Sequence, residues 1–260
     1  MGFFLTPWVT RLLFANAAMF LVTLTLGRIP QSLLLVPALI LQRPWSLVTY
    51  MFLHAGLGHI FFNMLMLAIF GPRVEERLGA TRFVRLYFAS GFAAALLSIL
   101  TPFAAILGAS GAVFGVMYAF VRFWPRAQIW IWGVIPVEAR VLFGISLVFA
   151  VLGIFGYGGQ GVAHFAHLGG FLGGFVYLKW SEATSPAARF KAKAAAAAAP
   201  AVRPGGDHRD LDRWRRIPGD ELHPLNREEL NRILDKISAT GVPSLSNAER
   251  AFLERFSATH

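Results

Sequence analysis

The sequence predicts an all-α fold: a polytopic membrane protein with a six-transmembrane-helix bundle, followed by a small soluble helical tail. Hydrophobic residues make up 56% of the 260 residues, the mean hydropathy is +0.56, and only 15% of residues are charged, against about 25% in soluble domains. Residues 1–180 contain only Glu75, Glu76 and Glu138 as acids. Apolar stretches of membrane-spanning length recur through this region, at roughly 20 residues per crossing.

The apolar stretches lie near residues 9–27, 57–71, 83–101, 109–124, 140–157 and 162–180. The second and fourth are short, and they carry His59, Asn63 and Ser110. We therefore expect these two helices at the centre of the bundle, surrounded by protein rather than lipid. The loop 28–56 is long and rich in Leu, Pro and aromatic residues, and we expect it to lie in the membrane interface.

Basic residues set the expected orientation, because Arg and Lys gather on the cytoplasmic side of membrane proteins. One side of the predicted bundle holds Arg11, Arg73, Arg77, Arg82, Arg85, Arg122, Arg126, Arg140 and Lys179, and the other only Arg28 and Arg43. Both termini are therefore expected in the cytoplasm, and a bacterial plasma membrane suits the six-span form. This placement accounts for the net charge of +10 without nucleic acid, which is not expected as a partner.

The composition changes after Trp180. We expect a transmembrane domain at 1–180, a flexible linker at 181–221 with an alanine run, and a helical hairpin at 222–260. The first tail helix is predicted from Asn226, as N-cap, to Ala239, with one apolar face of Leu230, Ile233, Leu234 and Ile237. The second is predicted to begin with a capping box at Ser246 and to bury Ala251, Leu253 and Phe256. The hairpin is interpreted as a module that binds an unknown cytoplasmic partner.

Ser110 is the first candidate for chemistry. Gly108 and Gly111 flank it and allow a tight turn, which places the serine in the first turn of the fourth helix. Backbone N–H groups of a first turn have no helical partner and are available to stabilise an oxyanion. The alternative is a serine that only caps a helix, since a Gly-x-Ser-Gly fragment is a weak signal.

His167 is the second candidate, and glycines follow it at helical spacing. The pairs Gly169/Gly173 and Gly170/Gly174 in the last helix match Gly111/Gly115 in the fourth. Small residues four apart allow two membrane helices to approach closely. We therefore expect Ser110 and His167 to meet, as a nucleophile and its base must. The alternative for His167 is a core histidine bonded to a backbone carbonyl. His164, one turn earlier, either shapes water access or bonds a loop, and we expect the structural role.

His59 and Asn63 are four residues apart and share one helix face. Both can donate hydrogen bonds to a developing oxyanion. The alternative is that they join helices, as polar residues in membranes often do. A metal site built from His54, His59, His164 and His167 is a weaker alternative, since the spacing matches no common zinc pattern and no Cys or carboxylate accompanies it. We expect no metal and no cofactor.

Together these motifs resemble those of the rhomboid family of intramembrane serine proteases, over about residues 8–180. The resemblance lies in His54…His59…Asn63, then Gly108-x-Ser110-Gly111, then His167-x-x-Gly170-x-x-x-Gly174, with Val74-Glu75 and Leu78-Gly79 between them. It implies that Ser110 is the nucleophile and His167 the general base of a dyad without an acid. It also implies an oxyanion hole of His59, Asn63 and the Ser110 backbone N–H.

The resemblance implies a supporting set of Gly108, Gly111, Phe114, His164, Gly170 and Gly174. Two positions depart from the family pattern: Phe114 replaces a common Tyr, and Trp45-Ser46 replaces a common Trp-Arg. The expected function is endoproteolysis of single-span membrane proteins within or near their transmembrane helix, with these segments and the lipid bilayer as partners. The alternative is a catalytically silent relative that binds membrane helices; the presence of both Ser110 and His167 argues against it.

Overall fold

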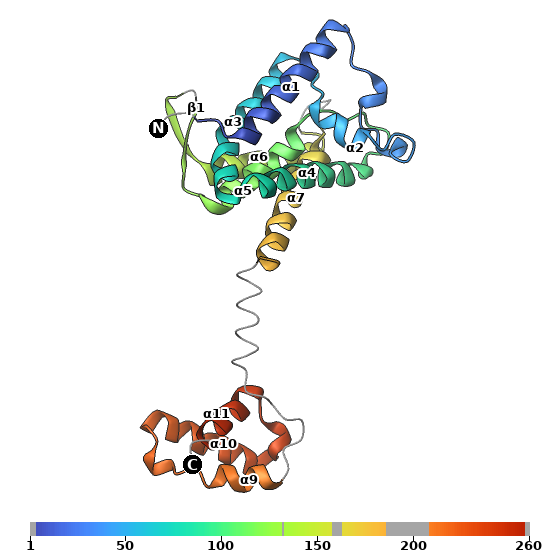
Figure 1. The fold of residues 1–260 in the computed structure, drawn as a ribbon. Helices are drawn as coiled ribbons and strands as arrows, with labels where there is room; N and C mark the ends of the chain where they lie inside the picture. The colour runs from blue at the N-terminus through green and yellow to red at the C-terminus, as the bar shows by residue number, and fades with distance from the viewer. Residues whose placement is uncertain (1–3, 132, 158–162, 186–207, 258–260) are drawn as a thin grey trace. The chain divides into compact units, whose positions relative to one another are not determined.

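The computed structural model describes residues 4–131, 133–157, 163–185 and 208–257. The chain divides into two units, Met1–Ala183 and Thr184–His260. The principal helices of the first unit are α1 (Pro7–Thr25), α3 (Leu57–Leu78), α4 (Ala80–Leu97), α5 (Ser110–Phe123), α6 (Ala139–Ile154) and α7 (His164–Ala183) (Figure 1). They coincide with the six predicted apolar stretches, so the helical class of this region is confirmed.

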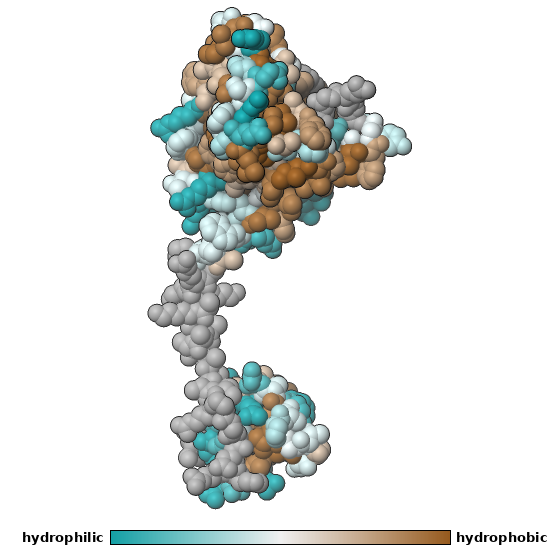
Figure 2. All heavy atoms as spheres, turned by 90° about the vertical axis from the view of Figure 1, so that its right-hand side faces the viewer, coloured by the Kyte–Doolittle hydropathy of each residue, from teal (hydrophilic) through white to brown (hydrophobic). Residues whose placement is uncertain are grey.

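Length and composition identify an integral membrane protein. Within the described part of the chain, three helical segments are long and apolar enough to cross a bilayer: Pro7–Thr25, Leu57–Leu78 and Ala80–Leu100, the last being α4 with a 3-10 turn. Helices α5 and α6 are shorter and also apolar. Apolar side chains cover much of the visible face of this unit, whereas polar ones are more frequent on the tail (Figure 2).

The expectation that the second helix is short is wrong, because α3 continues through Pro72 to Leu78. The apolar pattern stops near Gly71, but the charged residues beyond it contact other helices: Glu75 meets the start of α1, and Arg73 and Arg77 lie over aromatic rings at the end of α5. Glu75 is buried and accepts hydrogen bonds from the backbone N–H groups of Trp8 and Val9 and from the Thr6 hydroxyl. The two N–H groups belong to the first turn of α1, which leaves them without a helical partner, so Glu75 caps α1 from another helix.

Glycines hold α7 between two neighbours. A Cβ built on Gly170 would lie 2.0 Å from the Gly111 carbonyl oxygen, and one on Gly174 would lie 2.8 Å from that of Gly115. The predicted close contact between α7 and α5 is therefore present. The other pair faces α4 instead: a Cβ on Gly169 would lie 2.6 Å from the Ala93 carbonyl oxygen. Backbone approaches backbone on both sides of α7, as small residues permit.

Two loops complete the first unit. The segment before α3 forms 3-10 turns at Gln31–Leu33, Pro37–Leu39 and Tyr50–Phe52 and a short helix α2 (Ser46–Thr49); its placement in the membrane interface stays a prediction. Between α5 and α6 lies a β-hairpin, β1 (Gln128–Ile131) and β2 (Ile135–Glu138), which the sequence analysis did not predict (Figure 1). The strands are antiparallel, with Ile129 opposite Val137 and Trp130 opposite Pro136.

The tail contains α9 (His208–Arg215), α10 (Pro224–Thr240) and α11 (Asn247–Ser257). Its apolar core includes Leu230, Ile233, Ile237 and Leu253, as predicted, with Ala251 and Phe256 only partly buried. The interpretation of 181–221 as a linker is wrong at both ends. Helix α7 reaches Ala183, and α9 contributes Trp214, which is buried in this core. Residues 186–207 of the expected linker lie outside the described residues.

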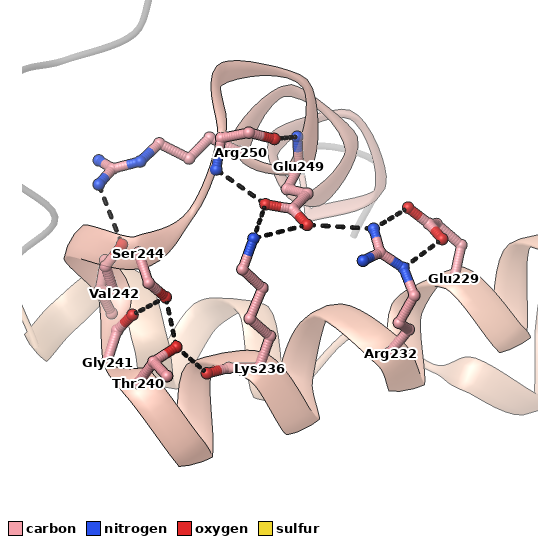
Figure 3. A network of polar contacts seen from close by, with 10 residues as sticks. Glu229, Arg232, Lys236, Thr240, Gly241, Val242, Ser244, Glu249 and Arg250 are labelled. Carbon is pink, nitrogen blue, oxygen red and sulfur yellow. Dashed lines mark hydrogen bonds and ion pairs between the residues drawn. The ribbon is translucent and has the colours of Figure 1, made fainter.

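The structure corrects the predicted start of the first tail helix and confirms that of the second. Helix α10 begins at Pro224 after the N-cap His223, and not at Asn226, because proline at the first helical position is already set to the helical φ. The capping box of α11 is confirmed: Ser246 N donates to the Glu249 carboxylate at 2.8 Å, and Glu249 N donates to Ser246 Oγ at 3.2 Å. The Glu249 carboxylate also binds Lys236 and Arg232 of α10 (Figure 3).

Candidate active site

Ser110 is the first residue of α5. The chain reaches it through Gly108, whose φ of +122° is a conformation that residues with a side chain rarely adopt. The Gly108 N–H donates to the Tyr50 carbonyl at 2.8 Å, which fixes this turn. A Cβ at Gly108 would lie 2.6 Å from His59 Nε2, so glycine is required both for the turn and for the approach of His59.

His167 lies in the first turn of α7, and its Nε2 is 2.9 Å from Ser110 Oγ. The predicted meeting of these two side chains is therefore present. Its cause is the contact of Gly170 with the backbone of Gly111, the residue after Ser110. The two helices could not come so close with a larger residue at 170.

Aromatic rings hold the imidazole in place. The Phe114 ring meets the His167 ring edge-on, with centroids 4.6 Å apart at 83°, and it stacks on Phe171 at 4.7 Å. Such pairs add stability beyond the burial of their area. Phe114 thus restricts His167 by contact alone, without the hydroxyl that a tyrosine would bring.

His59 and Asn63 lie on α3 beside the Ser–His pair. The Ala55 N–H points at His59 Nδ1 at 3.4 Å, which leaves Nε2 as the nitrogen able to donate. Asn63 Nδ2 donates to the His59 carbonyl at 2.9 Å through one of its two hydrogens. The second amide hydrogen and His59 Nε2 are the groups available to a bound carbonyl oxygen.

These four side chains share one cleft of about 520 Å³. The rest of its lining is mainly apolar or small and comes from several segments: Ala55, Gly58, Phe62, Met66, Ala105, Ile106, Leu107, Val113, Phe114, Ser146 and Ala163. A nucleophile, its base and two hydrogen-bond donors therefore face an apolar space. This arrangement suits acyl transfer from an apolar peptide segment to the serine hydroxyl.

His164 has a different position. Its ring packs against the backbone of Gly153 in α6, where a built Cβ would lie 2.1 Å from the ring. Both ring nitrogens are buried and have no hydrogen-bond partner among the described residues. His164 borders a second cavity of about 300 Å³. The His164 and His167 rings are 6.2 Å apart, and the His54 and His59 rings are 5.0 Å apart.

Sequence reasoning missed Ser146, which lies on α6 and lines the cleft. Its hydroxyl donates to the Leu142 carbonyl at 2.9 Å. The available signal was the one polar side chain in the interior of the apolar stretch 140–157, between Arg140 and Tyr157 at its ends. Polar residues in such a stretch usually face the bundle interior or a cavity.

Comparison with known families gives two matches. A model described as the rhomboid domain matches residues 41–180, which is more than half of the chain. A second model, a family of unknown function (DUF6576), matches residues 223–259, the region of α10 and α11. The first match contains Ser110 and His167, and also the hydrogen-bond donors His59 and Asn63.

Individual proteins show similarity to the first unit. RHOMBOID-like protein 1 of Arabidopsis thaliana is 38% identical over 136 residues, which are 51% of this chain and 33% of that protein. Rhomboid-like protease 3 of Toxoplasma gondii is 34% identical over 52% of this chain and 50% of its own. Rhomboid protease GluP of Bacillus subtilis is 32% identical over 50% of this chain and 25% of its own. Each match spans about half of this chain and no more than half of the relative.

Proposed function

Because the chain belongs to the rhomboid family, we propose that it is an intramembrane serine endopeptidase. Its substrates are single-span membrane proteins, cut within or near the transmembrane helix. The observation that carries the proposal is the 2.9 Å contact of Ser110 Oγ with His167 Nε2 inside an apolar cleft. A serine is a weak nucleophile until an adjacent base takes its proton.

The proposed reaction begins when Ser110 Oγ attacks the scissile carbonyl carbon and His167 Nε2 takes the hydroxyl proton. The resulting oxyanion accepts hydrogen bonds from His59, Asn63 and the Ser110 backbone N–H; one such donor is worth about 2.7–4 kcal/mol in other serine hydrolases. His167 then gives its proton to the leaving amine as the C–N bond breaks. Water hydrolyses the acyl-enzyme with His167 again as base.

The position of the buried carboxylate Glu75 supports a dyad of Ser110 and His167 without an acid. Glu75 lies twelve residues beyond Asn63 on α3, about 18 Å along the helix axis. Its carboxylate is occupied by the first turn of α1. The proposal therefore assigns the orientation of His167 to Phe114 and to the glycine contacts, not to a carboxylate.

The six helices α1, α3, α4, α5, α6 and α7 are proposed to span or fill the bilayer, with both termini in the cytoplasm of a bacterial cell. Helix α5 has 14 residues, a length of about 21 Å against a hydrocarbon core of about 30 Å. Ser110 at its first turn then lies below the outer surface, and water reaches it through the cleft.

The substrate helix is proposed to enter between α3 and α6. Phe62 and Met66 of α3 and Ser146 of α6 line the same cleft, so a segment that passes between these helices reaches Ser110. A helical peptide bond has its carbonyl engaged within the helix, so the segment must unwind first, and small or helix-breaking residues favour this. The tail is proposed as a module for a cytoplasmic partner.

The test compares the parent with Ser110→Ala and His167→Ala, each coexpressed with a tagged single-span substrate. Ser238→Ala and His223→Ala in the tail are the matched controls. We expect cleavage by the parent and both controls, no cleavage by either cleft variant, and labelling of Ser110 by a fluorophosphonate probe. Cleavage that persists in both cleft variants eliminates the dyad. Substrate that copurifies uncut with every variant, without labelling, supports a silent helix-binding protein.

A further inference from the structure

We propose that the β1–β2 hairpin anchors the protein in the membrane interface. Its outer face and tip would sit among lipid headgroups and the first acyl carbons, at the end of the bundle where the basic residues gather. The observations that carry the inference are the exposure of its apolar side chains, the arginines at its base and its continuity with the outward surface of α6.

The position of the hairpin follows from cation–π contacts at the end of α5. The Arg73 guanidinium lies 5.0 Å from the Trp124 ring, and that of Arg77 lies 5.6 Å from the Phe123 ring. Arginines at helix ends, with neighbouring aromatic rings, settle at the headgroup level. The chain enters β1 four residues after Trp124, so the hairpin leaves the bundle at that depth.

The two faces of the hairpin differ. Directly opposed residues of an antiparallel pair share a face: Ile129, opposite Val137, is buried against the bundle. Trp130, opposite Pro136, points to the other face and is 59% exposed. At the tip, Val134 is 73% exposed and Ile135 56% exposed. Large apolar side chains thus gather on the part of the hairpin that the described residues of the first unit leave uncovered.

The backbone limits how deep the hairpin can go. In the described ranges the sheet has two strands, so the outer edge of each strand carries backbone groups that no described strand pairs. Hydrocarbon cannot satisfy such groups, whereas hydrated headgroups can. At the base, Arg126 before β1 is exposed and complements anionic lipid phosphates, whereas the exposed Arg140 after β2 already pairs with the Glu138 carboxylate at 2.6 Å. The apolar tip, the Trp130 ring and the exposed arginine at the start of the hairpin together fit the membrane interface.

The surface continues into lipid-facing helix. Helix α6 starts directly after β2, and its exposed side chains include Val141, Ile145, Val148 and Phe149. Hydrogen bonds of 2.9 Å from Ala139 N to the Ala127 carbonyl and 3.0 Å from Arg140 N to the Pro125 carbonyl tie the hairpin base to both helices. A bilayer that contacts α6 therefore meets the hairpin without a break, which favours lipid over a protein partner.

The chain contains no cysteine, so one introduced cysteine carries one spin label. Val134→Cys is the test position. Phe149→Cys on α6 is the lipid control, and Glu228→Cys in the tail is the water control. The full chain, labelled with a nitroxide and reconstituted in phosphatidylcholine–phosphatidylglycerol vesicles, is measured for collision with oxygen and with a water-soluble nickel chelate.

We expect the oxygen-to-nickel ratio at 134 to exceed the ratio at 228 by several-fold and to stay below the ratio at 149. A ratio at 134 equal to the water control overturns the anchor. Low collision with both reagents also overturns it, because protein would then cover the tip. The same measurement in a Ser110→Ala background does not depend on proteolysis, so failure of the anchor and failure of the proposed enzyme are separable.

Discussion

Replacing Gly170 by alanine tests the structural basis of the Ser–His contact. The added Cβ would lie 2.0 Å from the Gly111 carbonyl oxygen, and real Cβ atoms stay beyond 3.0 Å from such neighbours. Helices α5 and α7 must therefore separate by about 1 Å, a shift that elsewhere costs about 100-fold in rate when it displaces a catalytic group. Overpacking of this kind typically costs about 1–3 kcal/mol of stability.

The assay measures cleavage of a tagged single-span substrate in proteoliposomes and thermal unfolding of the same preparations. Gly173→Ala is the matched control, because its Cβ would lie 2.6 Å from Ala93 Cβ of α4 and not against α5. A Cβ built on Gly144 meets no described atom of another segment within 4 Å, so Gly144→Ala should leave the cleavage rate and the thermal unfolding close to those of the parent. We expect Gly170→Ala to lose far more activity than Gly173→Ala at a comparable loss of stability. Equal rates for Gly170→Ala and the parent would refute the reasoning.

Three further predictions use other contacts. Glu75→Ala leaves the N–H groups of Trp8 and Val9 without their acceptor, so the free energy of unfolding, measured by denaturant titration, should fall by about 1–3 kcal/mol. Glu76→Ala, which changes the exposed neighbouring residue, is the control. Phe114→Ala removes the ring against His167 and should lower the cleavage rate by roughly tenfold, whereas Phe114→Tyr should retain it; equal loss in both would contradict the packing role. In the tail, hydrogen bonds from Lys236 and Ser246 lower the pKa of Glu249 from 4.5 to about 2. A carboxyl with a lowered folded pKa stabilises above its unfolded pKa and loses this contribution as pH falls from about 4.5 through 2. Hydrogen-exchange protection of α10 and α11 in the full chain, corrected for intrinsic rates, should therefore fall over that window, and Glu249→Gln should remove this dependence.

The helices and the Ser–His contact were predictable because each depends on a repeated local pattern. Apolar runs of membrane length gave the positions of α1 and α3–α7. Glycines four apart predicted a close crossing of α5 and α7, and therefore a meeting of Ser110 and His167. The spacing alone did not reveal that Gly169 and Gly173 face α4, because small residues mark a close approach without identifying the neighbour.

Other features depend on contacts between distant segments or on patterns too short to detect. Helix α3 extends to Leu78, and in this extension Glu75 binds the backbone of Trp8 in α1. The two residues are 67 positions apart in the sequence. The strands of the hairpin have four residues each, and so short a run gives too weak an alternation to be recognised between two apolar helices. Helix α9 offers few apolar residues, chiefly Leu211 and Trp214, which is too sparse for a periodic signal.

The cap on α1 also has a consequence for biosynthesis. The amides of Trp8 and Val9 leave the ribosome long before the carboxylate that receives them, since Glu75 follows 67 and 66 residues later. Until then those amides must stay hydrated at the bilayer surface, because hydrocarbon offers them no acceptor. Helix α1 is thus completed only after α3, which follows it in the chain, has been synthesised, and the order of translation differs from the order in which the bundle becomes rigid.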